Sequence, residues 1–417
     1  MEVYKFGGAS VKDAHAIQNV LKVLQSTQVK DVIIVVSAMG KTTNALEAVV
    51  AAYFDKDQDF NEPLARVWQY HKDILDELFP VGHAIFALAL SQINLIKDFL
   101  GRNKSPHYDF VYDQVVSHGE IMSTLIIHWF LKENGFCGTW IDIRENIKTN
   151  AAYREGKVDW ETTRMAIKKS MPKSGMVITQ GFIASDGNGF TTTLGREGSD
   201  YTGAIIAYCL DAKSLTIWKD VPGVLSADPR YFDHARLLNT ISYEEAIELA
   251  FYGASVIHPK TIQPLKRKEI PLYVKPFLAP AEKGTCVMLG EDIEPLTPCY
   301  ILKKNQVLIA LSSLDFSFMM EDNIGEVFKL LGRYGMKVDL IQNSAISFSV
   351  CVDNKFGKLD ELIAHLRANF HVDVMNPVNL YTIRHADVAA VRSLENRTNV
   401  LLKQQTGRTL QMVIGND

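Results

Sequence analysis

Residues 191–200, TTTLGREGSD, are the most informative stretch of this chain. They follow an apolar run at 176–183 that predicts a buried strand, and they precede an apolar-periodic stretch at 201–210 that predicts a helix. A glycine loop that opens a helix favours anion binding, because unpaired N–H groups and the helix dipole point into it. The segment therefore predicts a ligand site between a strand and a helix.

The charged residues of this loop suggest a ligand that carries both signs of charge. Arg196 offers a guanidinium for a carboxylate or phosphate, and Asp200 offers a carboxylate for a cation. An ordinary helix start is the alternative, with Ser199 as the N-cap residue and an acidic residue in the first turn. The segment alone does not decide between the two.

Outward from this loop, strand-like and helical stretches alternate. Apolar runs that predict strands lie at 2–6, 31–37, 139–143, 176–183 and 215–218. Helical patterns lie between them, and this order predicts an α/β domain with a mainly parallel sheet and a ligand site at the strands' carboxyl ends. Residues from about 55 to 105 are polar and helix-prone, which indicates a helical insertion.

A composition shift follows the α/β pattern. Residues 258–298 are rich in proline and predict a linker-like stretch, in which 271–274 could form an edge strand. From 306 onward the pattern favours two small α+β units of the βαββαβ type, the second of them shortened. The expected domains are therefore 1–295, 296–378 and 379–417.

Composition excludes several classes. With 417 residues, 47% hydrophobic and 22% charged, the chain suits two or three globular domains, and a net charge of -4 argues against a nucleic-acid partner. No apolar run approaches the roughly 18 residues of a membrane span. The first ten residues lack a signal-peptide layout, and five scattered cysteines without CxxC suggest neither disulfides nor a metal site. A cytoplasmic protein is expected.

Two glycine-containing turns near the N-terminus were compared as phosphate sites. In 5–10, KFGGAS, two glycines let phosphate oxygens approach the backbone and Lys5 adds a point charge; a tight turn with a solvated lysine is the alternative. The triplet at 40–42, GKT, is not a P-loop, because that motif needs glycine where Val35 stands. Ser37 and Thr43 remain candidates for polar contacts.

Two further segments carry candidate ligand groups. Residues 218–230 leave a strand and turn at Pro-Gly, so they could hold a nucleotide with Lys219 or Arg230 near phosphate, or be an ordinary polar loop. In 117–120, SHGE, a glycine inside a helical pattern costs about 1 kcal/mol and hints at close packing or ligand approach. Glu120 could accept an ammonium group or be a surface residue, whereas His118 is expected to be structural.

Taken together and in order, these segments resemble aspartate kinases of the amino-acid kinase fold. The matching stretches are 5–10, 117–124, 178–185, 191–204, 220–230 and 251–259. The C-terminal units look like the paired ACT domains with which this family senses amino acids. The resemblance implies transfer of phosphate from ATP, with Mg²⁺ on the nucleotide, to the side-chain carboxylate of L-aspartate. This is the first step towards lysine, threonine and methionine. It also implies an amino-acid effector and a homodimer or higher homo-oligomer.

The resemblance also implies roles for individual residues. Lys5 neutralises the transferring phosphoryl group, and Asp200 orients Lys5 and helps to hold the substrate ammonium. The remaining substrate contacts are Ser37, Thr43, Glu120 for the ammonium, Arg196 for the α-carboxylate, and Ser199. The ATP contacts are Lys5, Gly7, Gly8, Ser10, Lys219, Asp220, Arg230 and Ser255. The effector contacts are Asn323, Ile324, Asp339 and Ser344.

Several residues depart from the family pattern. Glu197 stands where the family commonly has glycine, and we expect its carboxylate to point to solvent. Ser255 replaces a common lysine, and Lys219 is hypothesised to supply the missing charge; Leu225 replaces a common tyrosine. Ala345 replaces a glutamate of lysine-sensitive members, so the effector stays open.

Two other functions remain open at this stage. One is another amino-acid kinase, such as a glutamate or acetylglutamate kinase, against which SHGE and the ACT-like pair argue. The other is a catalytically weak amino-acid sensor.

Overall fold

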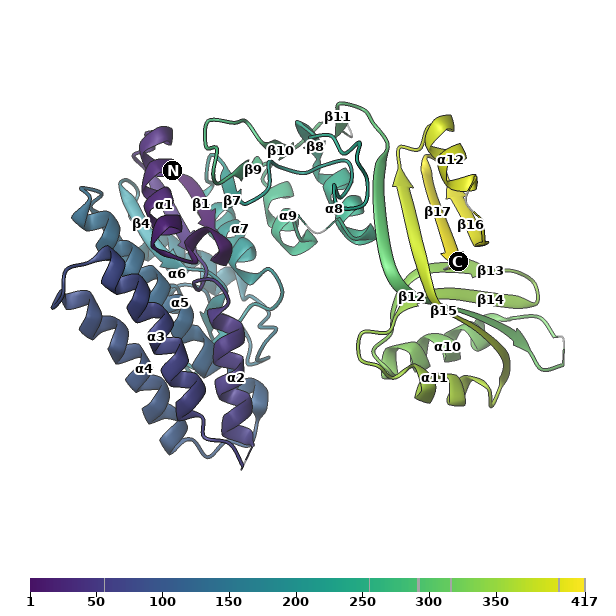
Figure 1. Cartoon of the computed structure of the whole chain (residues 1–417), viewed down its shortest axis with the longest axis horizontal. Coiled ribbons are helices and arrows are strands. Elements are labelled where there is room, and N and C mark those ends of the chain that lie inside the picture. The colour runs from purple at the N-terminus through teal and green to yellow at the C-terminus, as the bar shows by residue number, and fades with distance from the viewer. Residues whose placement is uncertain (56, 255, 291–292, 316, 397, 416–417) are drawn as a thin grey trace. The chain divides into compact units, whose positions relative to one another are not determined.

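The computed structural model describes residues 1–55, 57–254, 256–290, 293–315, 317–396 and 398–415. The chain divides into two compact units. The first comprises Met1–Val224, Leu237–Ile247 and Val256–Asp292, and the second comprises Leu225–Arg236, Glu248–Ser255 and Ile293–Asp417. Each unit has its own sheet (Figure 1).

The sheet of the first unit contains neighbouring strands in the order β8-β10-β9-β7-β1-β2-β4-β3. Their bounds are β1 Glu2–Phe6, β2 Val32–Val36, β3 Gly138–Ile141, β4 Met176–Gln180, β7 Leu215–Lys219, β8 Thr240–Ser242, β9 Leu272–Pro276 and β10 Thr285–Met288. All pairs between these strands are parallel except β9 with β10. The expected α/β class with a mainly parallel sheet is confirmed.

The central strand β1 is buried on both faces. Tyr4 and Phe6 pack in one core cluster with α1 (Ala14–Thr27) and α5 (Tyr108–Glu133). The alternating residue Lys5 lies on the opposite face, where α7 (Gly198–Leu210) approaches through the side-chain-free Gly203. Lys5 is thereby placed on the face of β1 that α7 covers.

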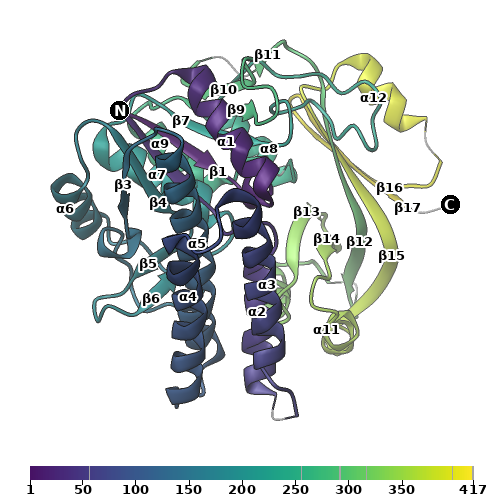
Figure 2. The same cartoon turned by 60° about the vertical axis from the view of Figure 1, so that its left-hand side comes forward.

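Further helices lie outside the sheet: α2 Thr42–Phe54, α3 Asn61–Leu78, α4 Ala84–Arg102 and α6 Trp160–Ser170. Figure 2 shows α2, α3, α4 and α5 as long neighbouring rods. Helices α3 and α4 occupy the range expected to be a helical insertion. By length and composition α4 could cross a membrane, contrary to expectation, although one such helix is weak evidence. It is amphipathic, since Ile93, Ile96 and Leu100 pack with α2 and α5 in a core cluster.

The proline-rich stretch is not a linker. It contains α9 (Pro259–Lys266) and then β9, which is an interior strand between β7 and β10, so the edge-strand expectation was wrong. Prolines are tolerated because Pro259 opens α9, while Pro271 precedes β9 and Pro276 ends it. No ladder donor is lost inside the strand, and Pro271 O even accepts from Leu215 N at 3.0 Å.

The second unit has an antiparallel sheet in the order β13-β14-β12-β15-β17-β16. The strands are β12 Cys299–Ser313, β13 Lys337–Asn343, β14 Ser347–Asp353, β15 Phe370–Arg384, β16 Val400–Thr406 and β17 Thr409–Gly415. Helices α10 (Glu321–Arg333), α11 (Leu359–Leu366) and α12 (Val388–Glu395) join them. The strands expected at 372–375 and 380–383 are parts of one strand, β15, and the expected boundary at 378 lies inside it.

Candidate active site

A cavity of about 390 Å³ opens where β1, β2 and β7 end. It is lined by Lys5, Gly7, Gly8, Ala9, Ser10, Ser37, Ala38, Gly40, Thr43, Glu120, Phe182, Gly195, Glu197, Gly198, Ser199, Trp218, Lys219 and Asp220. This is the carboxyl edge of parallel strands, where the alternation of elements predicted a ligand site. Most of the proposed ATP and aspartate contacts therefore come together at one place.

The turn after β1 brings backbone close to backbone. A Cβ at Gly8 would lie 2.8 Å from the carbonyl oxygen of Ala38 and 2.9 Å from that of Gly40, so only glycine fits. Gly40 N donates to Gly8 O at 3.0 Å, which joins this turn to the one after β2. Ser10 Oγ donates to Trp218 O at 3.3 Å and ties the same turn to β7. Two turns thus form one wall of the cavity.

A buried charge cluster forms one end of the cavity. Lys5 Nζ lies 2.6 Å from Asp200 Oδ1, and Lys219 Nζ lies 3.4 Å from Asp200 Oδ2. Burial would raise the pKa of Asp200, but the two ammonium groups outweigh it and hold that pKa below its ordinary value. Within this trio, the one carboxylate of Asp200 faces the two ammonium groups of Lys5 and Lys219.

Lys219 also reaches towards the segment that contains Ser255. Its Nζ donates to the carbonyl of Val256, the next residue, at 2.5 Å. Ser255 itself lies outside the described residues. The ammonium of Lys219 is therefore held by the backbone at Val256, and the hypothesis that it compensates for Ser255 stays a prediction.

The opposite case is Glu120 on α5. Its side chain is 2% exposed and lines the cavity, and its Oε2 has no hydrogen-bond partner among the described residues. Burial raises the pKa of Glu120 to about 8, although a backbone hydrogen bond from Ala38 and the charge of Lys5 lower it in part. A buried carboxyl group that faces a cavity, with one oxygen left without a hydrogen-bond partner, suits an incoming ammonium group.

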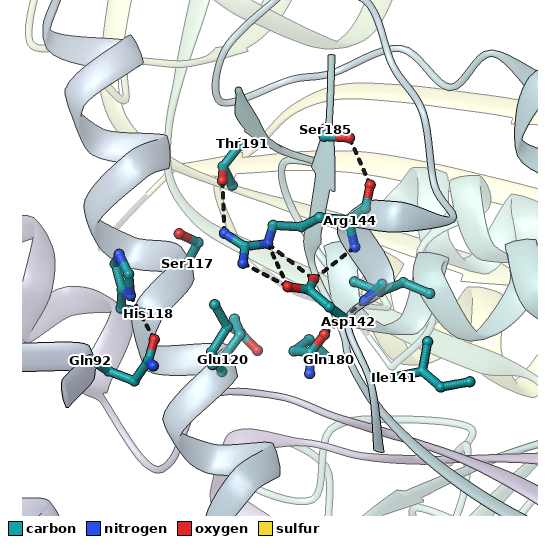
Figure 3. A network of polar contacts seen from close by, with 12 residues as sticks. Gln92, Ser117, His118, Glu120, Ile141, Asp142, Arg144, Gln180, Ser185 and Thr191 are labelled. Carbon is teal, nitrogen blue, oxygen red and sulfur yellow. Dashed lines mark hydrogen bonds and ion pairs between the residues drawn. The ribbon is translucent and has the colours of Figure 1, made fainter. Parts of the chain in front are cut away.

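Helix α5 holds Glu120 in place through its close packing. A Cβ at Gly119 would lie 2.9 Å from Thr42 Cγ2 and 3.1 Å from Leu46 Cδ1, so this glycine lets α5 approach α2. His118 Nδ1 lies 2.9 Å from Gln92 Oε1 of α4, and burial lowers its pKa to about 4 (Figure 3). A neutral, hydrogen-bonded His118 fits the expected structural role.

The same helix anchors the strand that leads into the 191–200 loop. Asp113 accepts hydrogen bonds from Thr193 N and Thr193 Oγ1, both at 2.8 Å. Gln114 of the same helix donates to Thr191 O at 2.8 Å. Outside this helix, Arg144 Nη1 donates to Thr191 Oγ1 at 3.2 Å (Figure 3). Strand β6 (Thr191–Thr193) is therefore fixed to the element that carries Glu120.

The helix start in this loop differs from expectation. Helix α7 begins at Gly198 with Glu197 as its N-cap, in the left-handed region at φ 54, so the N-cap interpretation of Ser199 was wrong. The side chain of Ser199 instead packs against Gly181, where a Cβ would lie 2.5 Å away, and it lines the cavity. Glu197 is exposed, as expected, yet it also lines the cavity.

Two arginines lie elsewhere. Arg196 is exposed and is not among the lining residues, and no carboxylate in the described part of the chain pairs with it. Its two neighbours, Gly195 and Glu197, both have positive φ. Arg230 belongs to the second unit, where its side chain pairs with Asp228.

The four effector candidates all lie in the second unit. Asn323 Oδ1 accepts from Met320 N at 3.1 Å at the start of α10, where Ile324 is half-buried, and Ser344 Oγ lies 2.7 Å from Ser347 Oγ. Asp339 is already paired, with Lys303 Nζ at 2.8 Å.

Sequence reasoning did not single out the two aromatic residues of the cavity lining, Trp218 and Phe182. Trp218 is 1% exposed, and its Nε1 has no hydrogen-bond partner among the described residues. Phe182 lines the cavity with a left-handed φ of 71. Trp218 belongs to the quoted 218–230 segment and could have been found there; the conformation of Phe182 left no sequence signal.

The family model of the amino acid kinase family matches residues 1–276. The chain belongs to this family. A relative, lysine-sensitive aspartokinase 3 of Escherichia coli (strain K12), is 36% identical over 357 residues, which are 84% of this chain and 78% of that protein. A bifunctional aspartokinase/homoserine dehydrogenase of Daucus carota is 32% identical over 298 residues, which are 68% of this chain but 32% of that longer protein.

Solved structures agree with the family assignment. E. coli aspartokinase III in complex with lysine and aspartate has a TM-score of 0.84 and 30% identity, with 100% of this chain and 96% of that chain covered. The same enzyme in complex with aspartate and ADP has a TM-score of 0.81 and 30% identity, with the same coverage. The amino-acid kinase fold, followed by a C-terminal antiparallel sheet, is thereby confirmed.

Proposed function

We propose that this chain is an aspartate kinase, which transfers the γ-phosphoryl group of ATP to the side-chain carboxylate of L-aspartate and forms 4-phospho-L-aspartate. One observation carries the proposal: the cavity joins two ammonium groups, Lys5 and Lys219, to the buried carboxyl of Glu120, whose Oε2 has no partner among the described residues. A polyphosphate needs the first and an amino acid needs the second. The similarity to aspartokinases supports this pairing of substrates.

The acceptor needs no general base, because its carboxylate is ionised at neutral pH. Catalysis is then positioning and charge neutralisation. Lys5 neutralises the phosphoryl group in transfer, and the N–H groups of Gly7 and Gly8 receive phosphate oxygens. Asp200 orients Lys5 through their 2.6 Å ion pair.

The remaining contacts divide between the two substrates. Ser10, Lys219 and Asp220 lie on the nucleotide side, to which Arg230 and Ser255 are added from the family resemblance. For aspartate, Glu120 takes the ammonium group, and Arg196, which lies outside the cavity lining, is added from the family resemblance for the α-carboxylate. Ser37, Thr43 and Ser199 line the cavity and supply hydrogen bonds to aspartate.

Mg²⁺ is proposed to arrive with the nucleotide. Among the described residues no three carboxylate, histidine or cysteine side chains cluster to hold a metal, whereas the single carboxylate of Asp220 lines the cavity. Mg²⁺ bound to the phosphates would supply further neutralisation of their charge.

The second unit is proposed to be regulatory. Its sheet fits two ACT-type units, 296–378 and a shorter 379–417, with an amino-acid effector near Asn323, Ile324, Asp339 and Ser344. Feedback by a product amino acid is supported by the relative that is lysine-sensitive. We further propose a homodimer or higher homo-oligomer that works in a reducing cytoplasm, in line with cysteines that are all free.

A coupled assay tests the function. Purified protein with ATP, Mg²⁺ and L-aspartate should form an acyl phosphate that hydroxylamine traps as a hydroxamate. A stronger signal with glutamate would indicate another amino-acid kinase, and no signal with either would indicate an amino-acid sensor. Repeating the assay with lysine, threonine and methionine identifies the effector.

A further inference from the structure

Helices α3 and α4 supply none of the cavity's lining residues, yet α3 reaches the backbone of its wall. The hydroxyl of Tyr70 donates to the carbonyl of Lys12, two residues beyond the KFGGAS turn. The same hydroxyl lies against Gly40, where a Cβ would be 2.6 Å from Tyr70 Oη. One phenol from α3 therefore touches both turns that form the wall.

The contact at Gly40 is transmitted to Gly8 through backbone. Gly40 N donates to Gly8 O at 3.0 Å, and a Cβ at Gly8 would meet Gly40 O at 2.9 Å. These two residues cannot shift independently, because a backbone hydrogen bond joins them and the space between them does not admit even a methyl group. The position of Tyr70 consequently fixes where the Gly8 turn presents its N–H groups.

The next residue of α3 secures the same region. His71 is fully buried; its Nδ1 donates to Val67 O at 2.8 Å, and its Nε2 lies 3.4 Å from Thr42 Oγ1. Thr42 Oγ1 donates in turn to Met39 O at 2.6 Å. His71 thus packs α3 against the start of α2. This contact holds the neighbouring residue Tyr70 in place.

We propose that Tyr70 is a positioning residue for nucleotide binding: its hydroxyl holds the Gly8 and Gly40 turns at the separation that suits the phosphates of ATP. The inference rests on the proposed kinase function and gives the helical insertion a task. Tyr70 acts through Gly40 and Lys12 and does not touch substrate.

The test replaces only the hydroxyl, with Tyr70→Phe. The matched control is Tyr53→Phe, since Tyr53 Oη also donates one hydrogen bond to a backbone carbonyl in the same helical region, at 3.1 Å, but to Asn103 and not to Lys12. Loss of one hydrogen bond, worth about 1 kcal/mol, should raise the KM for ATP and the Kd for MgADP about fivefold in Tyr70→Phe. The KM for aspartate should stay within about twofold, as should all constants of Tyr53→Phe.

A double-mutant cycle separates positioning from stability. Gly40→Ala places a methyl group against Tyr70 Oη, whereas in the Tyr70→Phe background the next ring atom, Cζ, is 3.5 Å away. The added methyl group should therefore weaken the binding of MgADP less in the Tyr70→Phe background than in the wild type. Unchanged MgADP affinity in Tyr70→Phe, equal weakening in Tyr53→Phe, or additive effects in the cycle would each overturn the proposal. MgADP calorimetry still decides if the wild-type chain fails to phosphorylate aspartate, which would refute the proposed function alone.

Discussion

Two carboxyl groups at the cavity are equally shielded from water, and yet their pKa values are shifted in opposite directions. Asp200 is 0% exposed and Glu120 is 2% exposed. Asp200 has two ammonium neighbours and a lowered pKa, whereas Glu120 has a pKa raised by burial to about 8. The partner, and not the burial, decides which group is ionised. Glu120, which has no ion-pair partner among the described residues, is the group that is proposed to bind the ammonium of a ligand.

The largest effect is expected from breaking the Asp200 end. Lys5→Met removes the nearer ammonium group and the charge that faces the transferring phosphoryl group. Hydroxamate formation should show kcat lower by about 10²- to 10³-fold, as for loss of one preorganised transition-state donor. Lys275→Met is the control, because Lys275 is over the Trp218 ring and is not a lining residue. A loss below tenfold would contradict the role of Lys5.

The next largest effect is expected at the other end. Glu120→Gln keeps the shape but cannot ionise to meet the ammonium of aspartate. A hydrogen bond to a charged group is worth about 1.5–3 kcal/mol, so the KM for aspartate should rise about 10- to 100-fold while the KM for ATP stays within about twofold. Steady-state kinetics measures both constants, and the exposed Glu145→Gln is the control. Equal changes in both KM values would show that Glu120 does not discriminate the substrates.

A smaller effect is expected for the second ammonium group. Lys219 is farther from Asp200 than Lys5 is, at 3.4 Å against 2.6 Å, and its side chain is 20% exposed. Lys219→Ala should raise the KM for ATP about fivefold, with Lys219→Arg intermediate. Kinetics that leave both the KM for ATP and kcat unchanged would refute the idea that Lys219 replaces the charge absent at Ser255.

The last prediction concerns stability and its dependence on pH, and no kinetic constant. Glu120 ionises near 4.5 when unfolded but near 8 in the folded state, so between these values the unfolded chain binds fewer protons. Stability of the ligand-free wild type should therefore fall as pH rises from 4.5 to 8 and then level off. Glu120→Gln lacks this loss, so its melting temperature should exceed that of the wild type by a gap that widens up to pH 8. A gap that is flat with pH would contradict the raised pKa.

Much of the first unit could be predicted, because parallel strands buried on both faces leave continuous apolar runs such as VIIVV of β2. The place of Lys5, Gly7 and Gly8 at the carboxyl edge of the sheet could be predicted as well, because Lys5 lies in β1 and the two glycines follow it directly. The helix start at Glu197 could not be predicted, because a left-handed glutamate leaves no sequence signal and Ser199 is the residue that propensity favours. The role of Arg196 stays a prediction, because this residue is exposed and lies outside the cavity lining.

The prediction for the proline-rich region was wrong for a different reason. A high proline content predicts a linker or an edge strand, but what matters is whether a proline removes a hydrogen-bond donor from the ladder between strands. Pro271 and Pro276 lie just before and at the end of β9, where neither interrupts the strand. In the second unit, two short apolar runs were separated by Asn376 and Pro377, although β15 continues through them.

Strands β12 and β15, with 15 residues each, run the full length of the second sheet. Residues 299–303 of β12 pair with 380–384 of β15, and residues 308–313 pair with 370–375. The two halves therefore have no hinge of their own in these strands. A chain cut after residue 378 would leave the first part of β12 with an open, unpaired edge prone to aggregation. For protein engineering, the second sheet has to be kept, exchanged or deleted as one piece.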